Sequence, residues 1–334
     1  MSTAEATPSL FGGNVAGESV KARGYWEQIW IRLRKDKLAI VGGVFIIVMF
    51  LVAFVGGPVA AKIMGHGPND QFFNAVDTNT FLPVGPWTHV KTPDGGTTLF
   101  IIGADSTIGR DLFLRMLYGA QTSLEVAVFA TFFSVGLGVM LGAVAGYFGG
   151  VIDTIVSRLT EMVMAFPVLL FIIAISATAG PSLNAITFGF LAPGVFTLVL
   201  IFSAFGWFYP ARLVRGQVLS LREKEFIEAA RMTGASDLRI VRSHLLPHLV
   251  GPVIVYSTLI VASNIIGEAG LSFLGLGIQE PTASWGNILS RAPEYYTTQP
   301  WLMIWPGLAI LFATLSFNIL GDGLRDAFDP RRNL

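Results

Sequence analysis

Six long apolar runs, separated by polar segments, dominate the hydropathy pattern of the chain. They cover residues 38–61, 123–147, 151–179, 185–209, 250–276 and 301–320. A helix needs roughly 20 apolar residues to cross the hydrocarbon core of a bilayer, and each run is long enough. The pattern therefore predicts an all-α, polytopic membrane protein with six transmembrane helices.

The polar segments predict how the chain is organised around these helices. Residues 1–37 are expected to form a tail and a juxtamembrane helix, and residues 38–61 the first transmembrane helix. Residues 62–117 form a long polar loop, within which Thr97 to Ile102 are predicted to be a short strand. Residues 118–322 are expected to form a five-helix core with a polar loop at 220–248, followed by a tail at 323–334.

Basic residues near the ends of the runs predict the orientation, because cytoplasmic loops carry an excess of Lys and Arg. They gather before the first run and after the fourth, at Lys21, Arg23, Arg32, Arg34, Lys35, Lys37, Arg212, Arg215, Arg222, Lys224, Arg231, Arg239 and Arg242. The long loop has only Lys62, Lys91, Arg110 and Arg115, and the loop before the sixth run has only Arg291. Both termini and the 220–248 loop are therefore expected in the cytoplasm.

Composition narrows the chemistry that the chain can perform. It is 53% hydrophobic and 13% charged, and it has no cysteine, which excludes disulfides and thiolate sites. No phosphate-cradling G-x-x-x-x-G-K-[ST] sequence and no HExxH pair occurs. We therefore expect no catalytic residue, no metal site and no cofactor on this chain.

The loop at 220–248 predicts two short amphipathic helices. Residues 222–232 are good helix formers, with Phe226, Ile227, Ala229 and Ala230 as the apolar stripe. Gly234 can adopt the left-handed conformation that ends a helix, and Ser236 can cap the next one. Pro247 is expected to stop that second helix near Leu246. A pair of helices lying on the bilayer surface is the alternative interpretation of the same pattern.

Polar and small residues inside the runs are candidates for packing or for a translocation path. Gly138, Gly142 and Gly146 fall on one helical face, which would let another helix approach closely. Asn264 and Glu268 lie in the fifth run, where Glu268 is either an interhelical partner, which we favour, or a ligand for substrate or an ion. Pro167 is expected to kink the third run.

Three sequence motifs resemble those of ABC-importer permeases of the dipeptide and oligopeptide branch. Glu228-Ala229-Ala230, Gly234 and Leu246-Pro247 are similar to the family's EAA loop, with His244 in place of its usual Ile. Asp105, Gly109, Arg110 and Asp111 match a signature preceding the permease core, in which Ala104 departs from the usual Thr. The stretches at 268–277 and 317–331 resemble two further family sequences.

The resemblance implies a subunit that moves substrate by alternating access. The EAA loop would dock on cytoplasmic ATPases, which bind ATP and Mg²⁺, with the small Ala229 and Ala230 suited to a helix pressed into a groove. The implied partners are a similar second permease, two ATPases and an extracytoplasmic binding protein that delivers di- or oligopeptides. Nickel and glutathione importers share these motifs and remain alternatives. An ion-coupled secondary transporter would require buried acidic ligands and repeated halves, and a membrane enzyme would require a catalytic cluster.

The charge bias generates a prediction about topology. Reporter fusions at Pro93 and Thr282 should read as extracytoplasmic, and fusions at Ser220 and Arg332 as cytoplasmic. An extracytoplasmic reading at Ser220 would contradict both the orientation and the proposed contact between the EAA loop and an ATPase.

Overall fold

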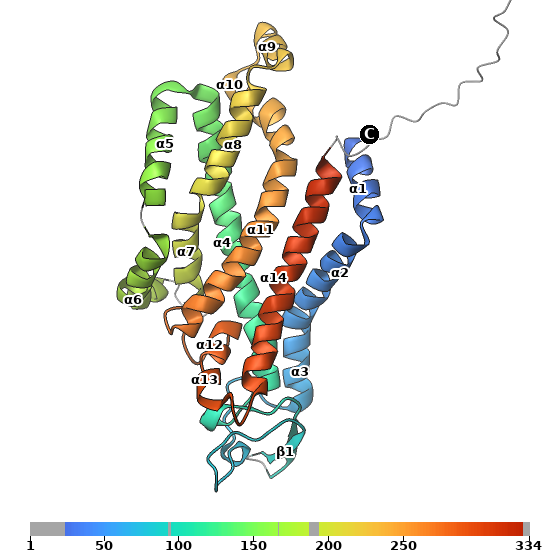
Figure 1. Ribbon diagram of the computed structural model, residues 1–334, viewed down its shortest axis with the longest axis vertical. Helices are drawn as coiled ribbons and strands as arrows, with labels where there is room; N and C mark the ends of the chain where they lie inside the picture. Colours follow the sequence, from blue (N-terminus) through green and yellow to red (C-terminus); the bar gives the residue numbers. More distant parts are fainter. Residues whose placement is uncertain (1–23, 93–94, 166, 187–193, 330–334) are drawn as a thin grey trace, which may run out of the picture.

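The computed structural model describes residues 24–92, 95–165, 167–186 and 194–329. Long helices run side by side between two ends of an elongated molecule (Figure 1). One end carries helices α1 and α9 and is called the α9 end. The other carries a small insert, residues 65–111, and is called the insert end. The predicted tail before residue 24 and the last residues after 329 lie outside the described residues.

The first span is one continuous helical run that covers the predicted segment. It comprises α2 (Lys37–Leu51), the π-helical turn η1 (Val52–Gly56) and α3 (Gly57–Met64). Asp36 caps α2 by accepting hydrogen bonds from the backbone N–H groups of Leu38 and Ala39. Gly65, with φ of 75°, ends the run in the left-handed conformation. The amphipathic helix α1 (Tyr25–Lys35) precedes it.

The insert folds around two small antiparallel ladders. Strand β1 (Thr88–Lys91) pairs with β2 (Thr97–Phe100), and β3 (Ala104–Asp105) pairs with β4 (Arg110–Asp111). Short 3₁₀ turns, η2 (Phe73–Ala75) and η3 (Ser106–Ile108), complete it. The strand predicted at 97–102 is confirmed over Thr97–Phe100. The hydrophobic core of the insert is a small cluster formed by Phe72, Ala75, Val90, Phe100 and Ala104.

Helix α4 (Leu112–Phe148) is the central element of the bundle and packs against α7, α8 and α11. It begins well before the predicted Ser123, because the Asp111 carboxylate caps its first turn at the backbone N–H groups of Phe113 and Leu114. Its 37 residues span roughly 55 Å, nearly twice the hydrocarbon thickness of a bilayer. Hydropathy marks only the apolar part of this helix, whereas the cap and the packing determine where it ends.

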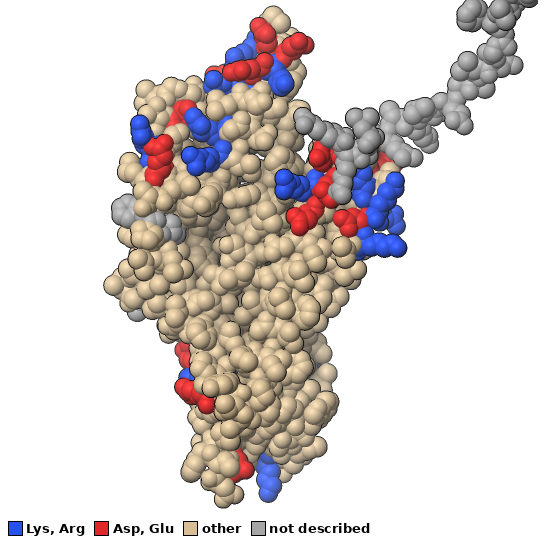
Figure 2. Space-filling model, viewed as in Figure 1, with Lys and Arg blue, Asp and Glu red and all other residues tan. Residues whose placement is uncertain are grey.

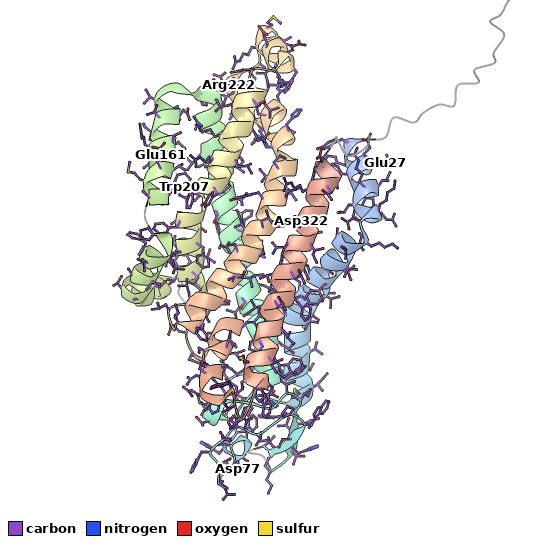
Figure 3. The ribbon with its side chains drawn as sticks, viewed as in Figure 1. Glu27, Asp77, Glu161, Trp207, Arg222 and Asp322 are labelled. Carbon is purple, nitrogen blue, oxygen red and sulfur yellow. The ribbon has the colours of Figure 1, made fainter. Side chains whose placement is uncertain are left out.

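The third and fourth predicted spans differ from the sequence-based boundaries. Helices α5 (Gly150–Ala165) and α6 (Val168–Ile186) meet at 83°, so the kink expected at Pro167 is a break between two helices. The next run, α7 (Val195–Gly206) and α8 (Phe208–Leu221), starts and ends later than predicted. Trp207 lies at the α7–α8 junction rather than at the end of the span (Figure 3). The helix continues because Pro210 falls in the first turn of α8, where its missing N–H is tolerated.

The remaining chain completes the bundle. The loop after α8 contains α9 (Glu225–Met232), α10 (Asp237–Arg239) and the π-helical turn η4 (Ile240–Leu245). It is followed by the long helix α11 (Leu246–Phe273), two short helices, α12 (Trp285–Leu289) and α13 (Ala292–Tyr295), and the last long helix, α14 (Trp301–Phe328). Within the described ranges, five helical runs are long and apolar enough to cross a membrane, and the bent α5–α6 pair would make a sixth. Charged side chains gather at the α9 end, while a broad uncharged band covers the middle (Figure 2).

Gly138, Gly142 and Gly146 form the face of α4 that touches α8. A Cβ atom added at Gly142 would lie 2.4 Å from the carbonyl oxygen of Ala211, and one at Gly146 would lie 2.9 Å from that of Arg215. Such distances leave no room for any side chain, so the two backbones are in direct contact. Small residues allow this close packing inside a membrane, where no hydrophobic driving force holds helices together.

The contact predicts that Gly142→Leu will force α8 away from α4. Overpacking of this kind costs on the order of a few kcal/mol, so assembly with partner subunits or transport should weaken. Gly136→Leu is the matched control, because an added Cβ there meets nothing within 4 Å. Thermal stability in detergent and complex yield are the measurements, and equal behaviour of the two variants would contradict the proposed packing role.

Candidate functional site

Helix α9 projects from the bundle at the α9 end, and only one side of it is packed (Figure 1). Ile227 and Ala230 are buried in a cluster with Val218, Ile240 and Leu245. Phe226, Glu228 and Ala229 are exposed. The predicted stripe is therefore wrong in part, because Ala229 is exposed and Phe226 lies outside the cluster, stacked on the His248 ring at 5.2 Å. Ala230, expected to face a partner, is only 9% exposed and packs internally.

Gly234 makes the turn after α9 in the left-handed conformation, with φ of 80°. The N–H of Gly234 donates to the carbonyl of Arg231 at 2.9 Å, and that of Ala235 donates to Ala230 at 3.0 Å, which satisfies carbonyls at the helix end. An added Cβ would meet nothing within 4 Å, so the left-handed backbone, and not a lack of space, favours glycine here. Ser236 occupies the N-cap position of α10, but its side chain makes no capping hydrogen bond.

Pro247 does not end the helix before it, contrary to the prediction. It lies in the first turn of α11, and η4 leads into α11 without a break. The π-helical register of η4 lets the chain stay helical up to a residue that cannot donate a backbone hydrogen bond. Leu246 is half-buried, and His244 lines a shallow hollow beside Ala229 and Gly234.

Side chains from α4 and α8 fasten this loop to the bundle. The Tyr147 hydroxyl donates to Asp237 at 2.6 Å, and the Arg231 guanidinium stacks over the Tyr147 ring at 5.5 Å. Arg222, at the end of α8, donates to the Gly146 carbonyl at 3.1 Å (Figure 3). Tyr147 and Asp237 lie 90 positions apart, and nothing in the sequence around either residue indicates that they meet.

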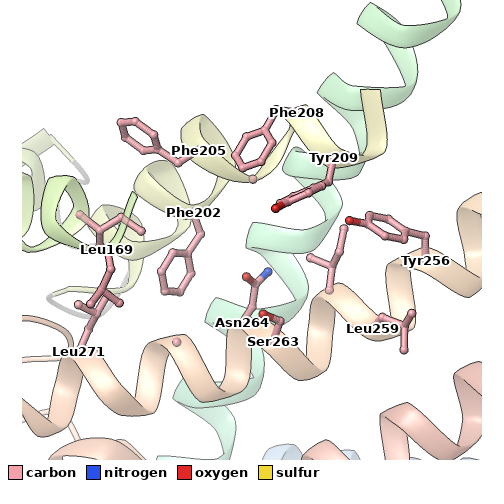
Figure 4. A pocket seen from close by; sticks show the side chains of 14 residues that line it. Leu169, Phe202, Phe205, Phe208, Tyr209, Tyr256, Leu259, Ser263, Asn264 and Leu271 are labelled. Carbon is pink, nitrogen blue, oxygen red and sulfur yellow. The ribbon is translucent and has the colours of Figure 1, made fainter. Parts of the chain in front are cut away.

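A cavity of about 380 Å³ opens between α7, α8 and α11 (Figure 4). Phe202, Phe205 and Leu169 line one side, and the rings of Tyr209 and Tyr256 lie together at one end. Ser263 and Asn264 point into it from α11. Asn264 also donates from Nδ2 to the Thr131 hydroxyl on α4 at 3.0 Å, which holds its amide in place.

Glu268, the other polar candidate in this span, lies away from that cavity. It is fully buried and accepts hydrogen bonds from the hydroxyls of Ser123 on α4, at 2.7 Å, and Ser272, at 2.6 Å. The Ser123 hydroxyl in turn accepts from the backbone N–H of Trp285 at 3.3 Å. This geometry makes Glu268 a link between α4, α11 and the short helix α12.

The residues of the 105–111 motif build a buried ionic cluster at the insert end. Asp105 lies 2.8 Å from Arg110 and 2.7 Å from Arg115, both of which are buried. Both arginines also pair with Glu280, which follows α11. Arg115 donates to Asn69 at 3.0 Å and to the Pro281 carbonyl at 3.2 Å. The cluster therefore joins the insert, α4 and the α11–α12 connection, with two acids matching two arginines.

The same motif holds the start of α4 by other contacts. Asp111 caps α4 with one carboxylate oxygen and contacts His66 Nε2 at 3.1 Å with the other. An added Cβ at Gly109 would lie 2.3 Å from the Phe72 carbonyl oxygen, and φ there is 73°. Only glycine fits that position, so the motif positions the insert on α4. Among the described residues, no three His, Asp or Glu side chains are grouped to hold a metal ion.

These features define a polytopic membrane bundle with a small extramembrane insert and a projecting helix pair. A chain of the MetNI methionine ABC transporter, in an inward-facing conformation, shares this fold with a TM-score of 0.51 over 64% of this chain and 96% of that chain, at 18% sequence identity.

Sequence comparison identifies the family. Residues 138–334 match the family of binding-protein-dependent transport system inner membrane components, and residues 24–83 match the N-terminal transmembrane domain of oligopeptide transport permease C. The chain is 37% identical to the dipeptide transport system permease protein DppC of Alkalihalophilus pseudofirmus, covering 92% of this chain and 90% of the relative. It is 36% identical, with the same coverage, to the glutathione transport system permease protein GsiD of Escherichia coli. The chain belongs to this family of ABC-importer permeases and is a multi-pass inner-membrane protein.

The ionic cluster predicts how acid affects stability. Burial alone would raise the pKa of Glu280, but the hydrogen bond from Arg110 and the charges of Arg115 and Arg110 lower it below its usual range. A lowered pKa means that the carboxylate stabilises the fold fully above about pH 4.5, and that this contribution is lost as pH falls through the lowered value. Because the Glu280 side chain is 36% exposed, solvent screens these contacts, so Glu280→Gln should cost at most about 1 kcal/mol at pH 7. The variant should also lose less thermal stability than the wild type as the pH falls.

The measurement is the melting temperature in detergent between pH 7 and pH 3. Glu294→Gln is the control, because Glu294 is an exposed acid at the same end. An acid dependence in Glu280→Gln equal to that of the wild type would show that the cluster does not depend on this carboxylate.

Proposed function

We propose that this chain is one permease subunit of an ATP-driven importer of di- or oligopeptides. It would pair with a second permease, two ATPases and an extracytoplasmic binding protein. The relatives named for dipeptide and glutathione transport support a short peptide as the substrate, since glutathione is itself a tripeptide. A glutathione importer is the second candidate, on the same comparison.

The observation that carries the proposal is the construction of the loop at 220–248. Ile227 and Ala230 anchor α9 from within, while Glu228 and Ala229 are presented outward beyond the bundle. The basic residues Arg222, Arg231 and Arg239 lie in or beside this loop, which supports a cytoplasmic location for this end by the positive-inside rule. An exposed helix that is held to the bundle by packing and hydrogen bonds is suited to transmit the movement of an ATPase to the membrane-spanning helices. Tyr147 and Arg222 would pass that movement to α4 and α8.

Alternating access then follows from differential binding. ATP would bring the ATPases together, α9 would move with them, and the cavity between α7, α8 and α11 would change the side to which it opens. Such a ligand-driven change requires that the nucleotide-bound ATPases interact more favourably with one state of the permease than with the other.

The proposal predicts that Ala229→Trp and Gly234→Val uncouple transport without preventing membrane insertion. Ala229 faces outward, so a bulky ring there would clash with a docked ATPase. Valine at Gly234 would be strained by about 1–2 kcal/mol in the left-handed conformation. Relief of this strain would change the direction of α9 relative to the bundle. Both variants should lose co-purification of the ATPases or the hydrolysis stimulated by the binding protein.

Gly234→Asn is the matched control, because asparagine tolerates the left-handed conformation and should retain coupling. Ala230→Trp would not test contact with an ATPase, because Ala230 is buried and a large side chain there would disturb the packing of α9 against its own chain. Wild-type docking, stimulated hydrolysis and uptake in Ala229→Trp and Gly234→Val would mean that the loop is only a surface helix pair.

A further inference from the structure

A second and larger hollow, of about 830 Å³, lies at the α9 end of the bundle. Its floor is α11, at Gly251 and Val255, and one wall is α8, at Leu213 and Gln217. The opposite wall comes from α14 and from the N-terminal helix α1, which lies outside the six-span core. Figure 1 shows α1 beside the end of α14, across from α8 and α11.

This hollow adjoins the cavity of Figure 4. Tyr256 and Leu259 on α11 line both of them. From Asn264 in the cavity to His248 at the far end of the hollow, α11 rises roughly 24 Å. The two spaces meet at Tyr256 and Leu259, and together, from the middle of the bundle toward its α9 end, they are called the groove below.

The chemistry of the groove changes along its length. Among the described residues that line the deep cavity, none is charged, and Ser263, Asn264, Tyr209 and Tyr256 supply its polar groups. The hollow at the α9 end carries charges of both signs in its lining, at Arg32, Asp322, Arg325 and Asp329. Charged side chains of both signs flank this region of the surface in Figure 2, and Figure 3 marks Asp322 on α14.

Helix α1 is held firmly enough to act as a wall. Arg32 Nη1 donates to the backbone carbonyls of Ala327, at 3.3 Å, and Asp329, at 3.1 Å. These carbonyls belong to the C-terminal end of α14, where helix carbonyls lack intrahelical donors. Trp26 packs edge-on against Phe328 with ring centroids 6.3 Å apart, and Ile29 is buried. Contacts at both ends of α1 thus fix it against α14.

We propose that α1 forms one wall of the exit by which a zwitterionic peptide leaves this permease for the cytoplasm. The inference rests on the proposed function and adds α1 to the route. A free peptide carries an amino group and a carboxylate, and the exit offers both acidic and basic partners for them. The uncharged cavity before it provides no fixed charge to retain either terminus, which favours onward movement. An anionic lipid headgroup fits less well, because Asp322 lies one helical turn from Arg325.

The test uses the complete transporter in inside-out proteoliposomes and exploits the absence of cysteine from the chain. Gln28→Cys places a thiol on the wall formed by α1, and Glu27→Cys is the matched control, exposed on the same helix but outside the groove lining. Each is treated with a bulky membrane-impermeant maleimide from the cytoplasmic side. The binding protein and radiolabelled dialanine or glutathione, whichever the complex imports, are enclosed in the lumen. The ATP-dependent movement of the peptide from the lumen to the cytoplasmic side, called uptake below, is measured together with ATP hydrolysis.

We expect modified Gln28→Cys to lose uptake while ATP hydrolysis stimulated by the loaded binding protein is unchanged. Modified Glu27→Cys should retain both. ATP trapping should also slow the labelling of Gln28→Cys but not that of Glu27→Cys. If Gln28→Cys lowers uptake before modification, Gln217→Cys on the facing wall provides the same test.

Two results would overturn the inference alone. One is normal uptake by fully modified Gln28→Cys. The other is a thiol at residue 28 that reacts in the isolated chain but never in the complex, which would mean that the second permease or lipid fills the groove. Failure of the unmodified chain to co-purify with ATPases would instead overturn the proposed function, and this inference with it.

Discussion

The direct backbone contact between α4 and α8 is the constraint on which the rest of the structure depends. Helices inside a membrane gain little from burying apolar surface, so they are held by close packing and by polar contacts. Gly138, Gly142 and Gly146 allow α8 to lie against α4 without intervening side chains. That contact fixes the two helices whose ends support α9, through Tyr147 and Arg222. It also fixes α8 as one wall of the groove.

The two ends of the bundle differ in their polar contacts: buried ionic and hydrogen-bonding contacts join the helices at the insert end, whereas a hollow separates helices at the α9 end. At the insert end, the ionic cluster around Arg115 and the buried Glu268 tie α4 to α11 and to the extramembrane segments. Arg115 is fully buried beside the buried Asp105, and separating a buried ion pair is costly, so this end is suited to stay together as one unit. At the α9 end, the helices diverge around the groove. In the proposed transport cycle, the insert end would stay together while the hollow at the α9 end changes its opening.

Under the proposed function, the lining of the groove would allow peptides of different sequence to pass. Its deep part combines aromatic surface with a few neutral hydrogen-bonding groups, which interact with a peptide backbone more than with particular side chains. Selection of substrate by the binding protein, rather than by this chain, is consistent with such a lining.

Periodicity and spacing in the sequence determined the all-helical class, the positions of most spans, the glycine face of α4 and the left-handed turn at Gly234. These features depend on residues within a few turns of one another, so the order of residue types specifies them. The tertiary structure decided which side of α9 is buried, because Ile227 and Ala230 face a cluster contributed by α4, α8 and η4. It also decided that α8 continues to Leu221 and that Pro247 starts α11, since caps and packing, rather than hydropathy, set helix ends. The pairing of Arg110 with Glu280 joins residues 170 positions apart, and no local pattern encodes a contact across that distance.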